Sequence, residues 1–264
     1  MMRSFLKFFV VIGLVIAPFC VEAASVKTSV IEYKIGSETF EGLMTSPVVL
    51  SKVKMPSILL VHNWMGVTDE TKHQAERIAE QGYNVLSVDV YGKGIRPKSP
   101  QEAGQLAGKY KSDRKRLRER LVGALKKLTS MDGVDAGKII AAGYCFGGTS
   151  VIELARSGAD VKGVVSFHGG LDSPTPTDGA KIKSKVLILS GADDPFQKAE
   201  DLAAFEKEMR DNKIDWQMVS FGGAVHSFTD KGAGSDNSKG AAYNAAADRR
   251  SFEMFKLFAR ENFK

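Results

Sequence analysis

Short apolar runs alternate with amphipathic segments along most of the chain. Several runs show no polar alternation, and each is bounded by glycine or polar residues. Runs of this kind are typical of strands in a sheet that is covered on both faces. We predict such strands within residues 57–66, 83–92, 138–145, 162–170, 185–195 and 214–228.

Two alternating stretches precede these runs, at residues 29–36 and 39–47, and they predict a hairpin. Apolar residues at helical spacing predict helices between the strands, with Asp69 capping the first one and Gly82 ending it. Residues 171–184 are expected to form a loop. The alternation of strands and helices predicts an α/β fold with a mostly parallel, eight-stranded sheet and helices on both faces. The helices are expected at 69–82, 99–112, 113–129, 147–158, 198–213 and 241–262.

The first residues have the layout of a secretory signal peptide. A start containing Arg3 and Lys7 precedes an apolar run at 8–19, and small residues precede a cleavage site after Ala23. The alternative is an uncleaved anchor helix, but the run is shorter than the roughly 20 residues that a bilayer core requires. We therefore predict a signal peptide at 1–23, one domain at 24–264 and export to the periplasm, with no membrane attachment after cleavage.

Composition narrows the possible partners. The chain is 43% hydrophobic and 26% charged, which argues against disorder, and its net charge is +6. The basic excess lies in residues 109–121, where leucines recur at helical spacing, so we interpret it as the solvated face of an amphipathic helix. No nucleic-acid-binding module is evident, so we expect no nucleic-acid partner. The cysteines and histidines show no metal-ligand spacing, and we expect no metal site.

Cleavage of the leader would remove Cys20 and leave Cys145 without a disulfide partner in the chain. A single thiol in an oxidising compartment is either buried and inert or reactive. The sequence around it favours the second interpretation. Gly143, Cys145 and Gly147 form a G-x-C-x-G pattern between an apolar strand and a helix, which matches a nucleophile elbow with cysteine in place of serine. The sharp turn requires small residues on either side, and the helix N-terminus favours a thiolate.

Candidate partners for this thiol follow two later strands. Asp194 lies at the end of one strand and His226 in the loop after the last strand, and the order nucleophile, acid, histidine is typical of such hydrolases. Asp193 or Asp194 could instead cap the next helix, and His226 could be an ordinary loop histidine. Asp193 also remains an alternative triad acid. His168 is expected to support the site, whereas His73 is expected to be exposed.

These motifs resemble the dienelactone hydrolase family over essentially the whole chain after the leader. The matching segments are "HNWMGVTD", "DVYGKGIRP", "GYCFGGT", "SFHGG", "GADDPF" and "GGAVHSF". The resemblance implies an α/β-hydrolase fold in which Cys145 is the nucleophile, His226 the base and Asp194 the orienting acid.

Two positions depart from the family pattern. Asn63 stands where members that open chlorocatechol-derived lactones carry a glutamate, and Thr229 and Asp230 stand where they carry a substrate-binding arginine. Lys93 falls where another anion-binding arginine is expected and could partly substitute. We expect Asn63, Tyr91 and Lys93 to contact substrate. Because the glutamate and the arginine are replaced, muconate-type lactones are in doubt as substrates.

The expected activity is hydrolysis of a small carboxylic ester or lactone through a thioester, without metal or organic cofactor. The backbone N–H groups of Phe146 and Trp64 are expected to form the oxyanion hole. The side chains of Trp64, Tyr91 and Phe146 are expected to line the pocket, and residues 93–112 to shape one wall.

Alternatives to this activity stay open. One is a non-catalytic exported binding protein that retains the fold. Another is a redox-sensing thiol protein, although such proteins usually have a second, resolving cysteine. The sequence does not indicate the natural substrate or the oligomeric state.

Overall fold

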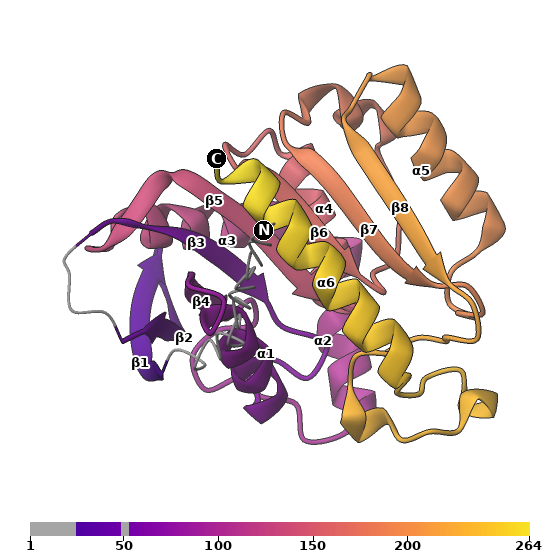
Figure 1. Ribbon diagram of the computed structural model, residues 1–264, viewed down its shortest axis with the longest axis horizontal. Coiled ribbons are helices and arrows are strands. Elements are labelled where there is room, and N and C mark those ends of the chain that lie inside the picture. The colour runs from indigo at the N-terminus through magenta and orange to yellow at the C-terminus, as the bar shows by residue number, and fades with distance from the viewer. Residues whose placement is uncertain (1–24, 49–52) are drawn as a thin grey trace, which may run out of the picture.

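The fold is built on one eight-stranded sheet. The structure is a computed structural model and describes residues 25–48 and 53–264. The predicted signal peptide lies outside these residues. The strands follow the order β1-β2-β4-β3-β5-β6-β7-β8, in which β1 and β2 form an antiparallel hairpin and β3 to β8 run parallel (Figure 1). They comprise β1 (Val26–Ile35), β2 (Glu38–Pro47), β3 (Met55–Val61), β4 (Asn84–Val88), β5 (Val134–Tyr144), β6 (Gly163–Phe167), β7 (Lys185–Gly191) and β8 (Trp216–Phe221).

The parallel strands are buried on both faces, as their unbroken apolar runs predict. On β3, Leu59 and Val61 belong to one hydrophobic cluster, whereas Ile58 and Leu60 belong to a second one. Successive side chains of a strand point to opposite faces, so the two clusters lie on the two sides of the sheet. The predicted α/β architecture with helices on both faces is thereby confirmed.

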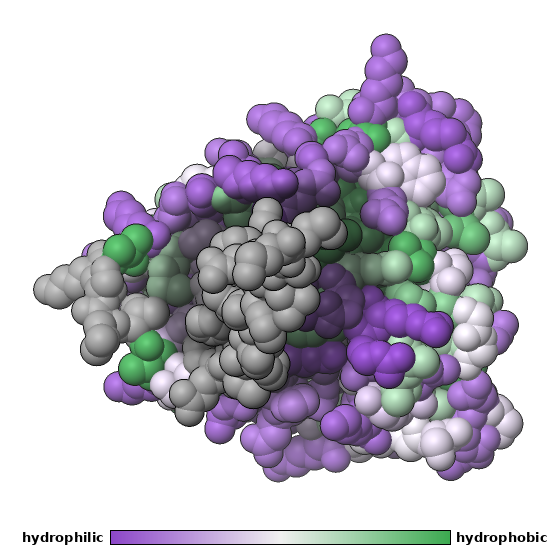
Figure 2. All heavy atoms as spheres, viewed as in Figure 1, coloured by the Kyte–Doolittle hydropathy of each residue, from purple (hydrophilic) through white to green (hydrophobic). Residues whose placement is uncertain are grey.

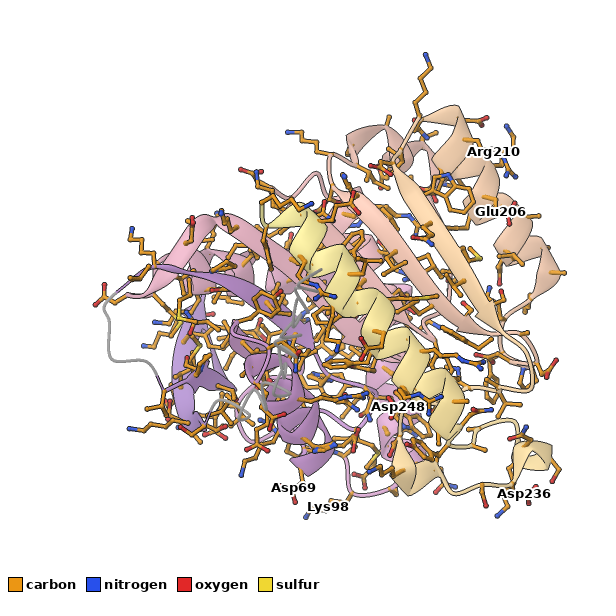
Figure 3. All side chains as sticks on the ribbon, viewed as in Figure 1. Asp69, Lys98, Glu206, Arg210, Asp236 and Asp248 are labelled. Atoms are coloured by element: carbon orange, nitrogen blue, oxygen red, sulfur yellow. The ribbon has the colours of Figure 1, made fainter. Side chains whose placement is uncertain are left out.

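Helices α1 (Asp69–Ala79) and α6 (Ala245–Asn262) cover one face, and α6 crosses the sheet diagonally in Figure 1. Arg77 of α1 binds Asp248 of α6 through Nη1 and Oδ1, 2.6 Å apart, and Figure 3 shows Asp248 near the start of α6. Hydrophilic side chains gather along the rim of this face in Figure 2. The ion pair therefore joins the end of α1 to the first turn of α6.

The opposite face carries α2 (Pro100–Ser112), α3 (Arg114–Thr129), α4 (Phe146–Arg156) and α5 (Ala199–Asp211). The prediction that the basic stretch is a solvated helix face is wrong in part, because Arg114 and Arg120 of α3 are buried. Arg120 lies over the rings of Phe40 and Tyr110, and Arg114 binds Asp172. Guanidinium groups remain charged when buried if carboxylates and rings surround them, which periodicity alone cannot reveal.

A fully buried ion-pair group joins α4 to α5. The guanidinium of Arg156 contacts Glu208 at 2.6 Å and Glu153 at 2.8 Å, and all three side chains are at most 2% exposed. Breaking such a pair by removing one partner costs about 3–5 kcal/mol. This group therefore fixes α4, whose first residue follows Cys145.

The helix boundaries correct two expectations. Thr68, rather than Asp69, is the N-cap of α1, where it forms a capping box with Thr71. The expected loop at 171–184 contains a 3₁₀ helix, η1 (Pro176–Lys181), and two shorter ones follow His226, η2 (Lys231–Ala233) and η3 (Asn237–Lys239). Among the described residues, no helix combines the length and apolar character needed to cross a membrane.

Candidate active site

Cys145 occupies the sharp turn between β5 and α4. Its backbone angles, φ 55° and ψ −114°, lie in a region that L-residues rarely adopt. A Cβ added to Gly143 would lie 2.2 Å from the carbonyl oxygen of Gly147, and one added to Gly147 would lie 2.2 Å from that of Val61. Only glycine fits at both positions, so the G-x-C-x-G pattern forms the tight turn that exposes the thiol at the end of the sheet.

His226 lies in the loop after β8, and its backbone is fixed on both sides. Its N–H donates to Gly240 over 3.2 Å, and its carbonyl accepts from Ala242 over 3.0 Å. Asp194 follows β7 by three residues, and its Oδ1 accepts from the N–H of Phe196 at 2.8 Å. These hydrogen bonds hold the two loops in position above the carboxyl ends of the strands.

The structure brings the thiol, the imidazole and the carboxylate together. His226 Nε2 lies 3.1 Å from Cys145 Sγ, and His226 Nδ1 lies 2.8 Å from Asp194 Oδ2. Asp193 does not face the imidazole, because its Oδ2 accepts from the N–H of Gly223 at 3.0 Å. Asp194 is not a helix cap either, since Lys198 is the N-cap of α5. Of the two aspartates, Asp194 is therefore the partner of His226.

The surroundings of His226 favour its protonated form. Burial by itself lowers the pKa of His226, but hydrogen bonds and charge interactions with Asp194 and Cys145 outweigh burial and raise that pKa to about 10. An imidazolium between a carboxylate and the sulfur is the arrangement that stabilises a thiolate. Part of the stabilisation of the imidazolium depends on the charge of the sulfur itself.

His168 packs beside this row of side chains, as expected. Its ring meets that of His226 edge-on with 5.2 Å between centroids, and its Nε2 lies 2.8 Å from Thr229 Oγ1. Burial lowers the pKa of His168 well below its usual value, so the ring is neutral. The described chain has four non-glycine residues with positive φ, and three of them lie here, at Cys145, His168 and Ser227. Such clustering of strain is typical of functional sites.

Two backbone N–H groups near the sulfur have no acceptor among the described residues. They belong to Phe146, the first residue of α4, and to Trp64, in the loop after β3. Neighbouring groups of that loop are engaged, because Asn63 Oδ1 accepts from the N–H of Met65 at 2.9 Å and the Trp64 carbonyl accepts from Tyr91 Oη at 2.8 Å. The two free donors are therefore available to an oxygen bound beside Cys145.

A cavity of about 240 Å³ opens on one side of the thiol. Helix α2 contributes Ala107 and Lys111, so the insertion at 93–112 forms part of one wall, as expected. Phe196 was not predicted as a site residue, yet its ring lies edge-on to His226 with centroids 5.3 Å apart. The walls consist of Trp64, Ala107, Lys111, Cys145, Phe146, Thr149, His168, Gly169, Gly170, Asp194, Phe196, Gln197 and His226.

A smaller cavity of about 30 Å³ lies against Cys145 toward α1, and Asn63 and Thr229 line it. Three buried polar atoms on its lining residues lack a partner among the described residues, namely Tyr144 Oη, Gln74 Oε1 and His168 Nδ1. A polar space of this size has room for one or two water molecules. The sequence does not predict this smaller cavity, because the helical pattern places Gln74 on the solvent-facing side of an amphipathic helix.

Two residues expected to bind substrate lie elsewhere. Tyr91 is buried behind the loop and packs on the rings of His62 and Phe146, so it supports the wall without lining either cavity. Lys93 pairs with Glu32 on the outer hairpin, and its N–H donates to Thr39. Neither Tyr91 nor Lys93 lines a cavity at Cys145 in this structure. Of the three expected contacts, only Asn63 lines a cavity, the smaller one.

No group of three or more potential metal ligands among His, Cys, Asp and Glu occurs in residues 25–48 and 53–264.

The sheet, the elbow and the position of the histidine loop define a hydrolase of the α/β class. Residues 40–262 match the model of the dienelactone hydrolase family, and the chain belongs to that family. Its membership, first indicated by the motifs, is thus confirmed.

Similar proteins cover most of the chain. The structure of "m3DLH" is 33% identical, with a TM-score of 0.86 over 90% of this chain and 99% of that one. The "Dienelactone Hydrolase-like Promiscuous Phospotriesterase P91 from Metagenomic Libraries" is 34% identical, with a TM-score of 0.84 and the same coverage. A Bradyrhizobium protein named "Probable 2-oxo-3-(5-oxofuran-2-ylidene)propanoate lactonase" is 27% identical over 70% of this chain and 77% of its own length.

Proposed function

We propose that this chain hydrolyses carboxylic esters or lactones through a Cys145-His226-Asp194 triad and a thioester intermediate. The observation that carries the proposal is the unbroken row of contacts from Sγ through the imidazole to the carboxylate, 3.1 and 2.8 Å long. Nucleophile, base and orienting acid within hydrogen-bond reach are the signature of nucleophilic catalysis. Membership of a hydrolase family supports the same conclusion.

In the first half of the reaction, the thiolate of Cys145 attacks the carbonyl carbon and a C–S bond forms. The C–O bond to the leaving group then breaks, and the leaving oxygen takes the proton from His226 Nε2. His226 can release that proton because acylation removes the negative charge of the sulfur, which contributes to its raised pKa. Asp194 keeps the ring oriented throughout through its bond to Nδ1.

In the second half, the neutral imidazole accepts a proton from water while the water oxygen attacks the thioester carbon. The C–S bond breaks, the carboxylic acid leaves, and the thiolate returns beside the reprotonated His226. The N–H groups of Phe146 and Trp64 stabilise the oxyanion in both halves. Oxyanion donors of this kind are worth roughly 3–4 kcal/mol each.

The shape of the larger cavity favours small or medium apolar substrates. Trp64, Phe146 and Phe196 supply apolar surface, and Lys111 supplies a cationic group at the wall. The lactonase name carried by the Bradyrhizobium relative supports lactones as part of the substrate class. We infer no particular lactone, because Lys93 does not reach the cavity.

A second candidate activity is hydrolysis of phosphotriesters at the same site. It is favoured by the similarity to a protein named as a promiscuous phosphotriesterase. The match covers 99% of the length of that protein. The thiolate of Cys145 would attack phosphorus while the free N–H groups bind the phosphoryl oxygen, and the P–O bond to the leaving group would break as His226 protonates the leaving oxygen. Water activated by His226 would then cleave the P–S bond, releasing the phosphodiester and the thiolate. Paraoxon, assayed beside esters and lactones, tests this activity.

The direct test uses Cys145→Ala and Cys145→Ser with a short p-nitrophenyl ester. We expect Cys145→Ala to abolish turnover and Cys145→Ser to retain at most a small fraction, because the alcohol is a poorer nucleophile. Circular dichroism checks that both variants are folded. Turnover that survives in a folded Cys145→Ala variant would refute the proposed function.

Labelling separates this function from the alternative of a non-catalytic binding protein. A thiolate held by His226 reacts with iodoacetamide well below pH 8, whereas an inert thiol does not. If labelling at pH 6 is rapid and becomes slower in the His226→Ala variant, the result supports an enzyme. Equal, slow labelling of both proteins supports the binding protein.

We also propose export of the chain through its first 23 residues. The support is the sequence layout alone, with its basic start, apolar run and small residues before Ala23. N-terminal sequencing of the protein from a periplasmic fraction tests cleavage after Ala23. An intact Met1 in the cell interior would contradict this proposal.

A further inference from the structure

The peptide group between Asn63 and Trp64 is held at its carbonyl end by two donors, the imidazole of His62 and the backbone N–H of Gly66, which lies 3.2 Å from the Asn63 oxygen. The distance from His62 Nδ1 to the Asn63 carbonyl oxygen is 2.5 Å. The same peptide carries the Trp64 N–H, which has no acceptor among the described residues. The carbonyl and the N–H point in opposite directions, so a bond at one end fixes the direction of the other.

The hydrogen bonds of His62 determine which nitrogen carries the proton. The backbone N–H of Val90 donates to His62 Nε2 over 3.1 Å, so Nε2 must be an acceptor without a proton. In a neutral ring the proton then sits on Nδ1 and is donated to the Asn63 carbonyl. Burial is the main cause that lowers the pKa of His62 to about 4, which keeps the ring neutral in this tautomer at ordinary pH.

We propose that His62 is the positioning residue of the oxyanion hole, acting through the Asn63–Trp64 peptide. Its Nδ1–H aims the Trp64 N–H toward the oxygen that forms beside Cys145. A hydrogen bond to the carbonyl also polarises the amide and makes its N–H a stronger donor. The inference rests on the proposed function, since it assigns a role in stabilising the oxyanion of that reaction.

The packing of His62 gives it little freedom to move. The side chain is 1% exposed, and its ring lies 4.8 Å from that of Tyr91 and 5.9 Å from that of Phe146 between centroids. Phe146 supplies the other free N–H, so one imidazole contacts residues on both sides of the hole. Tyr91 completes the support by donating from Oη to the Trp64 carbonyl.

Two substitutions separate the hydrogen bonds of His62 from its bulk. His62→Phe keeps a buried ring and loses both hydrogen bonds. His62→Gln can donate through its amide nitrogen to Asn63 and accept from Val90 through its oxygen. We expect kcat for a p-nitrophenyl ester to fall about 10- to 100-fold in His62→Phe with KM changed less than threefold, and most of the loss to be recovered in His62→Gln.

Alkylation of Cys145 by iodoacetamide separates the proposed role of His62 from a merely structural one. If His62 only supported the fold around Cys145, His62→Phe would slow alkylation as well as ester turnover. Alkylation requires the thiolate but forms no oxyanion, so we expect its rate in His62→Phe to stay within about twofold of the unsubstituted protein. A parallel fall of alkylation and ester turnover, or an unchanged kcat, would overturn the inference. Ester turnover that survives in Cys145→Ala would instead overturn the proposed function, so the two failures are distinguishable.

A measurement on the unsubstituted protein keeps the inference testable if His62→Phe does not fold. Long-range ¹H–¹⁵N correlation spectra report which ring nitrogen of a histidine is protonated. We expect His62 to be neutral with the proton on Nδ1 at pH 7. Protonation on Nε2 would show that the imidazole does not donate to the Asn63 carbonyl, and the inference would be wrong.

Discussion

The carboxylate of Asp194 lies 2.8 Å from Nδ1 of His226, and this contact joins the loop after β7 to the loop after β8. The side chain of Asp194 is 6% exposed, so its charge acts on the imidazole with little screening by water. The contact at Nδ1 leaves Nε2 of His226 facing Cys145.

Replacing Asp194 by asparagine keeps the size of the side chain and removes its charge. We expect kcat/KM for a p-nitrophenyl ester to fall about 10²- to 10⁴-fold, because the imidazole loses both its orientation and the stabilisation of its protonated form. Asp193→Asn is the matched control, since Asp193 binds the Gly223 N–H instead, and its activity should stay within about threefold. Equal losses in both variants would show that the assignment of the acid is wrong.

The raised pKa of His226 predicts a dependence on pH that differs between leaving groups. His226 is protonated below pH 10 and loses its proton as the pH rises through about 10. An alkyl ester needs that proton on its leaving oxygen, so kcat/KM should fall above pH 10, whereas a p-nitrophenyl ester should show a weaker decline. Rates are measured from pH 7 to 10.5 with Cys145→Ala as the blank. Identical profiles for the two esters would contradict the role of His226 as the acid.

Two buried histidines predict a loss of stability in mild acid. His62 has a pKa lowered to about 4 and that of His168 is also lowered, both chiefly by burial, so they stay neutral in the folded chain. The unfolded chain binds more protons below pH 6.5, so the free energy of unfolding decreases as pH falls. The slope approaches about 1.4 kcal/mol per pH unit for each histidine. Urea unfolding at pH 7, 6 and 5 measures this slope. The slope should be smaller in His62→Gln. An unchanged slope in that variant would argue against a neutral His62 in the folded chain.

The elbow glycines predict a large difference between similar substitutions. Gly147→Ala would place a Cβ 2.2 Å from the Val61 carbonyl and 2.7 Å from that of His62, so we expect a loss of about 1–3 kcal/mol in unfolding free energy and a displaced loop after β3. Gly222→Ala is the control, because no atom lies within 4 Å of its added Cβ. Denaturant unfolding compares the two variants. A Gly147→Ala variant with full stability and activity would contradict the geometry of the elbow.

Much of the site could be predicted from the sequence because parallel strands bring their carboxyl ends to one edge. The ends of β5 and β7 and the loop after β8 carry Cys145, Asp194 and His226, and the topology alone places these segments side by side. The glycines around Cys145 indicated the tight turn between the strand and the helix. The motifs of the family then indicated which aspartate faces the histidine.

The sequence did not reveal that Tyr91 and Lys93 lie away from the cavities, because it does not give the order of the strands. Their strand, β4, lies between β3 and the β1–β2 hairpin, one step farther from the elbow than β3. Asp89 Oδ1 accepts from the N–H groups of Tyr91 and Gly92 and turns the chain, so Lys93 reaches Thr39 on the hairpin. A side chain that follows a strand at the same edge can therefore still face away from the site.

The sequence also could not show which residues of α2 and α1 line the cavities. Lys111 and Gln74 lie on amphipathic helices, where a polar residue is ordinarily solvated. Only the docking of these helices shows that Lys111 lines the larger cavity and that Gln74 lines the smaller one. Helix periodicity predicts which side is apolar, but it does not reveal which polar residue lies over a thiol.

The proposed reaction passes through a covalent acyl group on Cys145, and rapid-quench mass spectrometry detects this group. The protein is mixed with p-nitrophenyl acetate, quenched in acid within milliseconds to seconds, and digested. We expect one added acetyl group on the peptide 139–156, discharged by neutral hydroxylamine as a thioester and absent from Cys145→Ala. Turnover without any adduct on this peptide, or with an adduct on another residue, would show that Cys145 is not the nucleophile.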